Sequence, residues 1–284
     1  MKHVILYALA LLAIAVLAML QRRQEGLYRA STVRTVQTCS KSFDDFPRGF
    51  DSKNYPRSRM AVLRPGVVAI TCGPREHGSK GGVILRSDST CRGAREIKLT
   101  FDVKFGDTGK KFDFGRGGKV GLGVQFGQGD IQGGDWLPTA ASARLMFRED
   151  GRATGYVYYG KRPSSKLDAV NDQHRDYALV AYPTGTGGHD LWLEGKSRRP
   201  PLPRFKSGAW QTVSLYCRMN TPNRQDGVIE VTIDGTTRRF DKMRWLDDPT
   251  GVNNVQFCVW YGGSTDDWAP KTKQTFFFKN LRAS

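Results

Sequence analysis

The sequence predicts an all-β protein in which two antiparallel sheets pack as a β-sandwich behind an N-terminal hydrophobic anchor. Short stretches of alternating apolar and polar residues recur along the chain, and no long amphipathic helical pattern competes with them. Glycine is abundant, at 32 residues, and the 15 phenylalanines and 10 tyrosines lie mainly in those stretches. The 284 residues would permit two small domains, but one large β domain is the simpler interpretation.

The first element is an uncharged stretch from Val4 to Leu20, with Lys2 before it and Arg22 and Arg23 after it. Its seventeen residues are near the minimum for a membrane span. A signal peptide cleaved after Ala18 is the alternative. Residues 1–23 are therefore interpreted as a transmembrane anchor or signal segment, and the protein is expected to be membrane-anchored or secreted.

Residues 24–45 are polar and lack periodicity, so they are predicted to form a linker, and the compact domain is expected over residues 46–284. The clearest strand is Glu96–Phe105, in which apolar and polar side chains alternate strictly. Further strands are predicted at Val67–Thr71, Val83–Arg86, Lys119–Phe126, Ser142–Arg148, Tyr156–Tyr159, Thr212–Met219, Val228–Ile233, Val255–Tyr261 and Thr275–Leu281. This number of strands is enough for two packed sheets.

Asp234-Gly235 lies between two alternating runs and predicts a hairpin, because glycine tolerates the positive φ of such turns. The polar stretch from Gly160 to Ser207 shows little alternation and contains prolines that cannot join a central strand. It is interpreted as a long surface excursion.

The five cysteines show no CxxC spacing, so a zinc site is not expected. Cys217 and Cys258 lie in predicted strands and are interpreted as small buried apolar residues. In an exported domain, Cys72 and Cys91 are a candidate disulfide, although sequence does not fix the connectivity.

The formal charge is +17, and removing Lys2, Arg22 and Arg23 still leaves 41 basic against 27 acidic residues, or +14. Such a domain attracts polyanions, but charge alone does not distinguish nucleic acid, acidic lipid and acidic sugar. Nucleotide chemistry is disfavoured, because Gly118-Lys119 is followed by Val120 where a phosphate-binding loop needs Ser or Thr. The four histidines lack metalloprotease spacing and no G-x-S-x-G occurs.

Strand parity selects two polar faces. In Lys119–Phe126 the apolar residues share one face, and Lys119, Gly121, Gly123 and Gln125 share the other. An extended ligand close to the backbone and a tight packing contact explain these glycines equally well. In Ser142–Arg148, the residues Ser142, Arg144, Met146 and Arg148 share a face, as do Tyr156 and Tyr158 in the next run. Guanidinium and phenol groups recognise carboxylates and stack on sugar rings, although an ordinary solvated face is the common alternative.

The order of three motifs resembles polysaccharide lyase family 14, which includes alginate and glucuronan lyases of large algal viruses. The motifs are GGK at Gly117–Lys119, SARLMFR at Ser142–Arg148 and GYVYYG at Gly155–Gly160. The resemblance implies a jelly-roll sandwich, no cofactor and no metal, and it leaves association with a virion open. The chain departs from the family pattern at Val120–Val124, and Phe147 stands where the family has Trp.

Carried over by position, the resemblance implies Lys119, Ser142, Arg144, Tyr156 and Tyr158 as catalytic residues. Gln125, Arg148 and Arg116 are predicted to bind substrate. The implied reaction is β-elimination on a polyuronate, glucuronan or alginate. Arg144 would neutralise the uronate carboxylate, Ser142 would position it, and Lys119 or Tyr158 would act as base.

Two other functions remain open from the sequence. A non-catalytic protein could hold an acidic polysaccharide with the same residues while tethered to a membrane or virion. A nucleic-acid partner is not expected, because the basic residues are dispersed and the anchor would take the domain away from most nucleic acid.

Overall fold

The computed structural model describes residues 39–51, 57–78, 81–131, 137–158, 180–181, 188–191, 202–247 and 250–284. These residues belong to one compact unit, Thr38–Ser284. The predicted anchor, Val4–Leu20, and most of the predicted linker lie outside them. Within the described ranges, no helix has both the length and the apolar character needed to cross a membrane.

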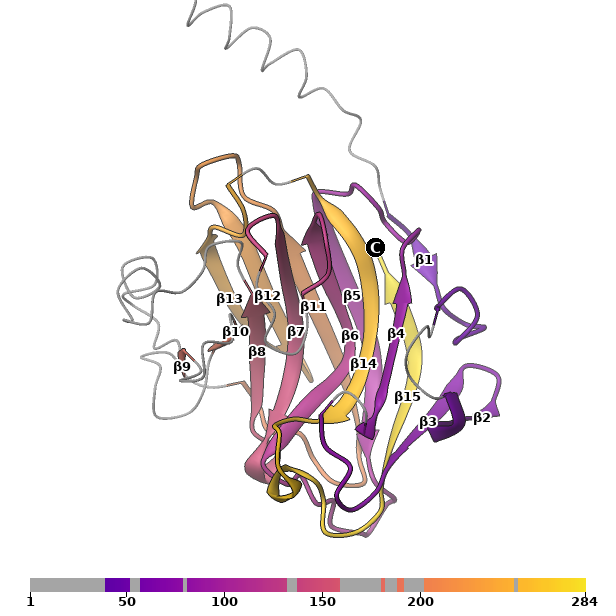
Figure 1. Cartoon of the computed structure of the whole chain (residues 1–284). Coiled ribbons are helices and arrows are strands. Elements are labelled where there is room, and N and C mark those ends of the chain that lie inside the picture. Colours follow the sequence, from indigo (N-terminus) through magenta and orange to yellow (C-terminus); the bar gives the residue numbers. More distant parts are fainter. Residues whose placement is uncertain are drawn as a thin grey trace, which may run out of the picture. The chain divides into compact units, whose positions relative to one another are not determined.

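Two sheets account for the described strands, and every pairing between neighbours is antiparallel (Figure 1). Sheet A has the order β13-β12-β11-β5-β15-β3-β2, with β1 also paired to β15. Its strands are β1 (Lys41–Ser42), β2 (Met60–Arg64), β3 (Val67–Cys72), β5 (Glu96–Phe105), β11 (Trp210–Arg218), β12 (Gly227–Ile233), β13 (Thr236–Met243) and β15 (Gln274–Ala283).

Sheet B has the order β4-β14-β6-β7-β8-β10-β9. Its strands are β4 (Val83–Ser87), β6 (Gly117–Gly127), β7 (Ala140–Arg148), β8 (Ala153–Tyr158), β9 (Val180–Ala181), β10 (Gly188–Leu191) and β14 (Val252–Tyr261). The antiparallel β-sandwich predicted from the sequence is therefore confirmed.

The core lies between the two sheets and is rich in phenylalanine. Phe105 of β5 packs against Phe147 of β7, with ring centroids 5.7 Å apart, and Phe257 of β14 packs against Phe278 of β15 at 4.9 Å. These contacts join residues from opposite sheets, as expected when each strand turns its apolar face inward. They fix which face of each strand points outward.

The outer faces of the two sheets differ in exposure. In β5 and β11, buried residues alternate with more exposed ones. In β7 and β8, every residue is buried. The polar side chains on the outer face of sheet B at β7 and β8 are thus buried, which is unusual for the exterior of a sandwich.

The predicted strands are found with small differences at their ends, and the Asp234-Gly235 hairpin joins β12 to β13. Two predictions about the connections were incomplete. Residues 39–43, assigned to the linker, are part of the fold, since β1 pairs with β15 and Phe43 is buried. In the segment predicted as a surface excursion, β10 joins sheet B beside β8, and Leu202 and Phe205 are buried.

The predicted Cys72–Cys91 disulfide is wrong. Cys91 is bonded to Cys39, with their Cα atoms 5.1 Å apart, while Cys72 is a free, buried thiol on β3. The prediction that Cys217 and Cys258 are buried is confirmed. Burial raises the pKa of the Cys258 thiol to about 11, so it is protonated at neutral pH.

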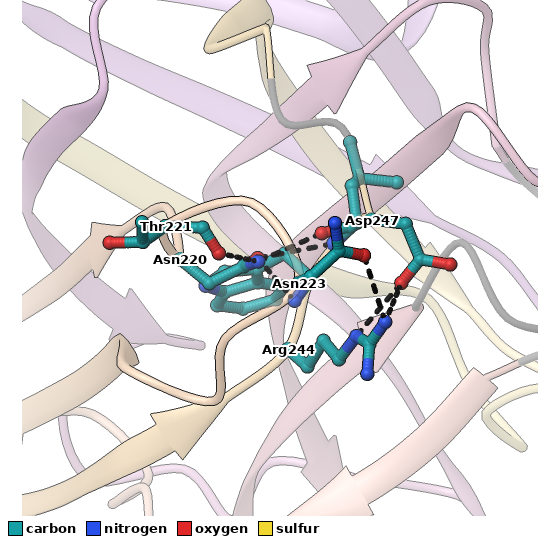
Figure 2. Close-up of polar contacts among 7 residues, drawn as sticks. Asn220, Thr221, Asn223, Arg244 and Asp247 are labelled. Atoms are coloured by element: carbon teal, nitrogen blue, oxygen red, sulfur yellow. Dashed lines mark hydrogen bonds and ion pairs between the residues drawn. The ribbon is translucent and has the colours of Figure 1, made fainter. Parts of the chain in front are cut away.

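A buried asparagine joins the β11–β12 loop to the segment after β13 (Figure 2). The Asn220 side chain accepts hydrogen bonds from the backbone N–H groups of Trp245, at 2.8 Å, and Leu246, at 3.2 Å. It donates to the carbonyl oxygens of Leu246 and Thr221, both at 2.8 Å. The Trp245 ring packs on Phe126, with centroids 5.4 Å apart, so this network supports the end of β6.

Candidate active site

The outer face of sheet B brings the five predicted catalytic residues onto three neighbouring strands. In the register of the sheet, Ser142 of β7 lies opposite Tyr158 of β8, and Arg144 lies opposite Tyr156. Lys119 of β6 lies opposite Met146 on one side and Trp260 of β14 on the other. The prediction from strand parity placed these side chains on one face, and the structure shows them there.

An irregularity in β6 makes room for Arg144. The register between β6 and β7 shifts between Val120 and Val124, so the intervening residues of β6 have few partners on β7. A Cβ atom on Gly123 would lie 2.8 Å from the Ala143 carbonyl oxygen and 2.9 Å from Cγ of Arg144. Gly123 therefore leaves the space in which the arginine stem lies.

Gly121 has a different role from the one that parity predicted. Its φ is +78°, and a Cβ atom there would lie 2.2 Å from the ring of Phe101, a core residue of sheet A. Gly121 thus faces the core, because the irregularity interrupts the strict alternation of β6. Tight packing explains this glycine, and contact with a ligand does not.

Lys119 lies among aromatic rings and cations. Its Nζ atom is 4.6 Å from the ring centroid of Tyr156 and 5.4 Å from that of Trp260. Burial, followed by the positive charges of Arg144 and Arg148, lowers the pKa of Lys119 to about 7, although Asp190 opposes this shift. A large share of this amine is neutral at neutral pH and is able to accept a proton.

Arg144 is the most deeply buried cation of the candidate site, with 2% exposure. It donates to the backbone carbonyl of Ile131, and its guanidinium carbon lies 5.8 Å from the ring centroid of Tyr158. Its Nε and Nη1 atoms have no hydrogen-bond partner among the described residues, and neither has the hydroxyl of Ser142. Buried polar groups are nearly always paired, so these donors stand out among the described residues of this face.

The two tyrosines are joined through their hydroxyl groups. The Tyr156 and Tyr158 oxygens are 3.2 Å apart, and the rings meet edge to face with centroids 5.3 Å apart. Both rings are buried in a cluster with Ile131 and Met146. The pair connects the surroundings of Lys119 to those of Arg144, since Tyr156 contacts the former and Tyr158 the latter.

The three predicted substrate-binding residues differ in their surroundings. The Gln125 side chain donates to the carbonyl of Ile131 at 3.1 Å and accepts from Asn254 at 2.7 Å, within the same face as Arg144. Arg148 is buried and pairs with both carboxylate oxygens of Asp190 on β10. This ion pair neutralises the charge that was predicted to bind substrate, and it holds β10 next to β8.

Arg116 lies apart from the other candidates, on the exposed turn before β6. It forms an ion pair with Asp267 at 2.6 Å. It lines a pocket of about 730 Å³ together with Phe114, Glu149 and Asp267. Among the described residues it has no hydrogen bond or ion pair to the five catalytic candidates, so the structure does not join it to their site.

Sequence analysis missed several residues on this face. Asn254, Gln256 and Trp260 alternate along β14 and point to the same side as Lys119. The same parity that selected Arg144 would have found them, had it been applied to this strand. Asp190 gave no such signal, because its short strand lies in a polar stretch without alternation.

The family model of polysaccharide lyase 14 matches residues 69–281 of the chain. The chain belongs to polysaccharide lyase family 14. The matched range contains every strand from β4 to β14 and most of β3 and β15. It also contains all five catalytic candidates.

Solved structures share this fold. The alginate lyase Aly36B matches with a TM-score of 0.63 and 24% identity, over 86% of this chain and 95% of that one. The alginate lyase vAL-1 from Chlorella virus matches at 0.61 and 21%, over 79% and 87%. The endo-β-1,4-glucuronan lyase from the fungus Trichoderma reesei matches at 0.54 and 11%, over 87% and 95%. No curated protein matches the chain.

At these identities the solved structures establish the shared fold, while the family model establishes that the chain is a polysaccharide lyase of family 14. Variants of Aly36B have been solved with an alginate trisaccharide and an alginate tetrasaccharide. A protein that shares this fold, Aly36B, therefore binds acidic oligosaccharides.

Proposed function

We propose that the chain cleaves an acidic polyuronate, alginate or glucuronan, by β-elimination on the outer face of sheet B. The observation that carries this proposal is Lys119, an amine whose pKa is lowered to about 7 and which lies beside a buried arginine and two tyrosines. The alginate and glucuronan lyases that share the fold support the choice of polymer.

The reaction has three requirements. The C5 proton is acidic only because of the neighbouring carboxylate, so that carboxylate must be neutralised. A base must remove the proton. The electron pair of the C5–H bond then forms the C4–C5 double bond, while the bond from C4 to the glycosidic oxygen breaks. The departing oxygen then takes a proton.

Arg144 meets the first requirement. It is permanently charged, it is buried, and its Nε and Nη1 donors have no partner among the described residues. A carboxylate there would receive charge-assisted hydrogen bonds that strengthen as negative charge builds up in the transition state. The hydroxyl of Ser142, also without a partner in the described part of the chain, would orient the same carboxylate.

Lys119 meets the second requirement and the tyrosine pair the third. A base with a pKa near 7 combines a useful neutral fraction with enough basicity to accept a proton. Tyr158, hydrogen-bonded to Tyr156, carries a phenol O–H that is placed to protonate the leaving oxygen. Of the two bases left open by the sequence, the lowered pKa favours Lys119.

The test is an assay for ultraviolet-absorbing unsaturated product on a panel of purified alginates and polyglucuronate. The wild type should release product from at least one polymer. Lys119→Ala and Tyr158→Phe should lower turnover by roughly 10²–10⁴-fold while polymer binding stays measurable. Arg144→Ala should lose binding as well, since its contact exists in the ground state.

The result also decides between turnover and simple binding. A wild-type protein that binds the polymers but releases no product from any of them would identify a tethered polysaccharide-binding protein. If Lys119→Ala and Tyr158→Phe both retain the wild-type rate, the assigned mechanism is wrong.

A further inference from the structure

The outer face of sheet A carries an aromatic and basic patch that the proposed reaction does not use. We call it the Trp210 patch, and it consists of Trp210 on β11, Lys104 and Asp102 on β5, and Phe277 and Lys279 on β15. These three strands are neighbours in sheet A (Figure 1). Lys104 lies directly between Trp210 and Phe277 in the register.

The side chains of the Trp210 patch contact one another closely. Nζ of Lys279 is 4.5 Å from the Trp210 ring centroid, and Nζ of Lys104 is 5.7 Å from it and 4.5 Å from that of Phe277. Trp210 is 37% exposed, a large fraction for an indole, which is usually well buried. Lys104 forms no ion pair with any residue that the structure describes.

A purely structural role would be for the lysine stems to shield the two rings from water. That role would not need ammonium groups on the rings, and it would not leave an indole 37% exposed on the face of a sheet. Neighbouring strands are about 4.8 Å apart, so Trp210, Lys104 and Phe277 span roughly 10 Å. This is a flat platform on the scale of two sugar rings.

We propose that the Trp210 patch is a second, non-catalytic binding site for the acidic polysaccharide. The indole would stack on the apolar face of a sugar ring, and Lys104 and Lys279 would pair with uronate carboxylates. Because both sheets bury their inner faces in one core, this site lies on the opposite side of the sandwich from Lys119 and Arg144. The choice of ligand rests on the proposed function.

Charge and hydroxyl content favour a sugar over an anionic membrane surface as the partner. Asp102 lies within the patch, where a planar layer of negative head groups could not avoid it, whereas a single polymer chain can place its carboxylates at the lysines and its hydroxyl groups near Asp102. Its carboxylate accepts hydrogen bonds from Thr212, at 2.8 Å, and Asn280, at 2.7 Å, and lies 3.9 Å from Nζ of Lys279. Such alternating donors and acceptors match the hydroxyl and carboxylate groups of a polyuronate.

The experiment uses the full-length protein carrying Lys119→Ala, so that the polymer is not degraded during the measurement. Retardation is measured in native gels containing alginate or polyglucuronate, and binding of an alginate tetrasaccharide is measured by calorimetry. The variants are Trp210→Ala and the pair Lys104→Gln with Lys279→Gln. Arg224→Gln with Lys242→Gln is the control, since it removes the same charge from exposed residues outside the patch.

Trp210→Ala is expected to weaken polymer binding by roughly threefold to tenfold, the usual worth of one aromatic contact. The double lysine variant should weaken it more than the control does. Tetrasaccharide binding at the catalytic face should change less than polymer binding, because one short chain does not reach both sides of the sandwich.

Three results would overturn this inference. These are unchanged polymer binding in Trp210→Ala, an equal loss in the lysine variant and its control, or binding to phosphatidylserine vesicles that depends on Trp210 while polymer binding does not. Absence of unsaturated product from the wild type would instead contradict the proposed function. The two failures are therefore distinguishable.

Discussion

At the scale of single residues, the protonation of Lys119 sets the expected pH dependence. Its pKa lies at about 7 because burial and the cations Arg144 and Arg148 disfavour the charged amine. If Lys119 is the base, kcat/KM should rise as the pH increases through about 7 and level off above it, since this ratio reports the free enzyme.

The same profile measured on Tyr158→Phe is the control, because that change removes the proton donor and leaves the lysine. Its acidic limb should stay near pH 7 while the plateau falls. A limb near the ordinary lysine pKa in the wild type would contradict the lowered pKa on which the choice of Lys119 as the base rests.

Gly123 offers a second test at this scale, because an added methyl group would meet both the β7 backbone at Ala143 and the stem of Arg144. An added Cβ would meet Cγ of Arg144 at 2.9 Å, so Gly123→Ala should move the guanidinium and lower turnover by roughly 10–100-fold. Gly235→Ala is the matched control, since its φ of +78° strains the hairpin without touching the site. That control should lower the thermal transition but keep the rate, and equal activity in both variants would exclude the predicted role of Gly123.

At the scale of elements, the strand period explains what the sequence could and could not predict. Alternation places Ser142 and Arg144 on one face of β7. Because the opposite face of β7 is buried against the other sheet, the orientation of these residues is fixed. Alternation predicted the wrong face for Gly121, because an irregularity in β6 turns this residue toward Phe101. Asp190 was not predicted, because its strand, β10, is held by pairing with β8 and by the ion pair between Asp190 and Arg148. A polar stretch without alternation reveals neither interaction.

The Asn220 network gives a prediction about how elements are joined (Figure 2). Asn220→Ala would leave the buried N–H groups of Trp245 and Leu246 without their acceptor. Each such orphan costs about 1–3 kcal/mol, so the free energy of unfolding should fall by about 2–6 kcal/mol in urea titrations. Asn223→Gly, which removes an exposed contact to Arg244 at 3.3 Å and tolerates the φ of +59° at this position, should change it by less than about 1 kcal/mol. Equal effects would show that the buried bonds do not stabilise the join.

At the scale of the whole molecule, we propose an oxidising location outside the cytosol, which the cysteine chemistry supports. The Cys39–Cys91 disulfide ties the start of the described chain to the domain, and such bonds persist mainly in exported proteins. Sequence could not have chosen this pair over Cys72–Cys91, because the pairing depends on β1 lying beside β15, which has no strong local signal. The proposed location would bring the enzyme to polysaccharide outside the cell, so it is consistent with the proposed function.

The N-terminal segment completes this argument, and it can be tested directly. We expect the protein expressed with its native N-terminus to sediment with membranes and to resist an alkaline wash, because Val4–Leu20 has the length and apolar character of a span. A chain lacking residues 1–23 should remain soluble, since the rest carries a net charge of +14 by the count above. The sedimented protein should also show the Cys39–Cys91 bond as a reduction-sensitive shift in gel mobility, which places the domain on the oxidising side. Recovery of a soluble protein that begins after Ala18 would identify a cleaved signal peptide and a secreted lyase instead.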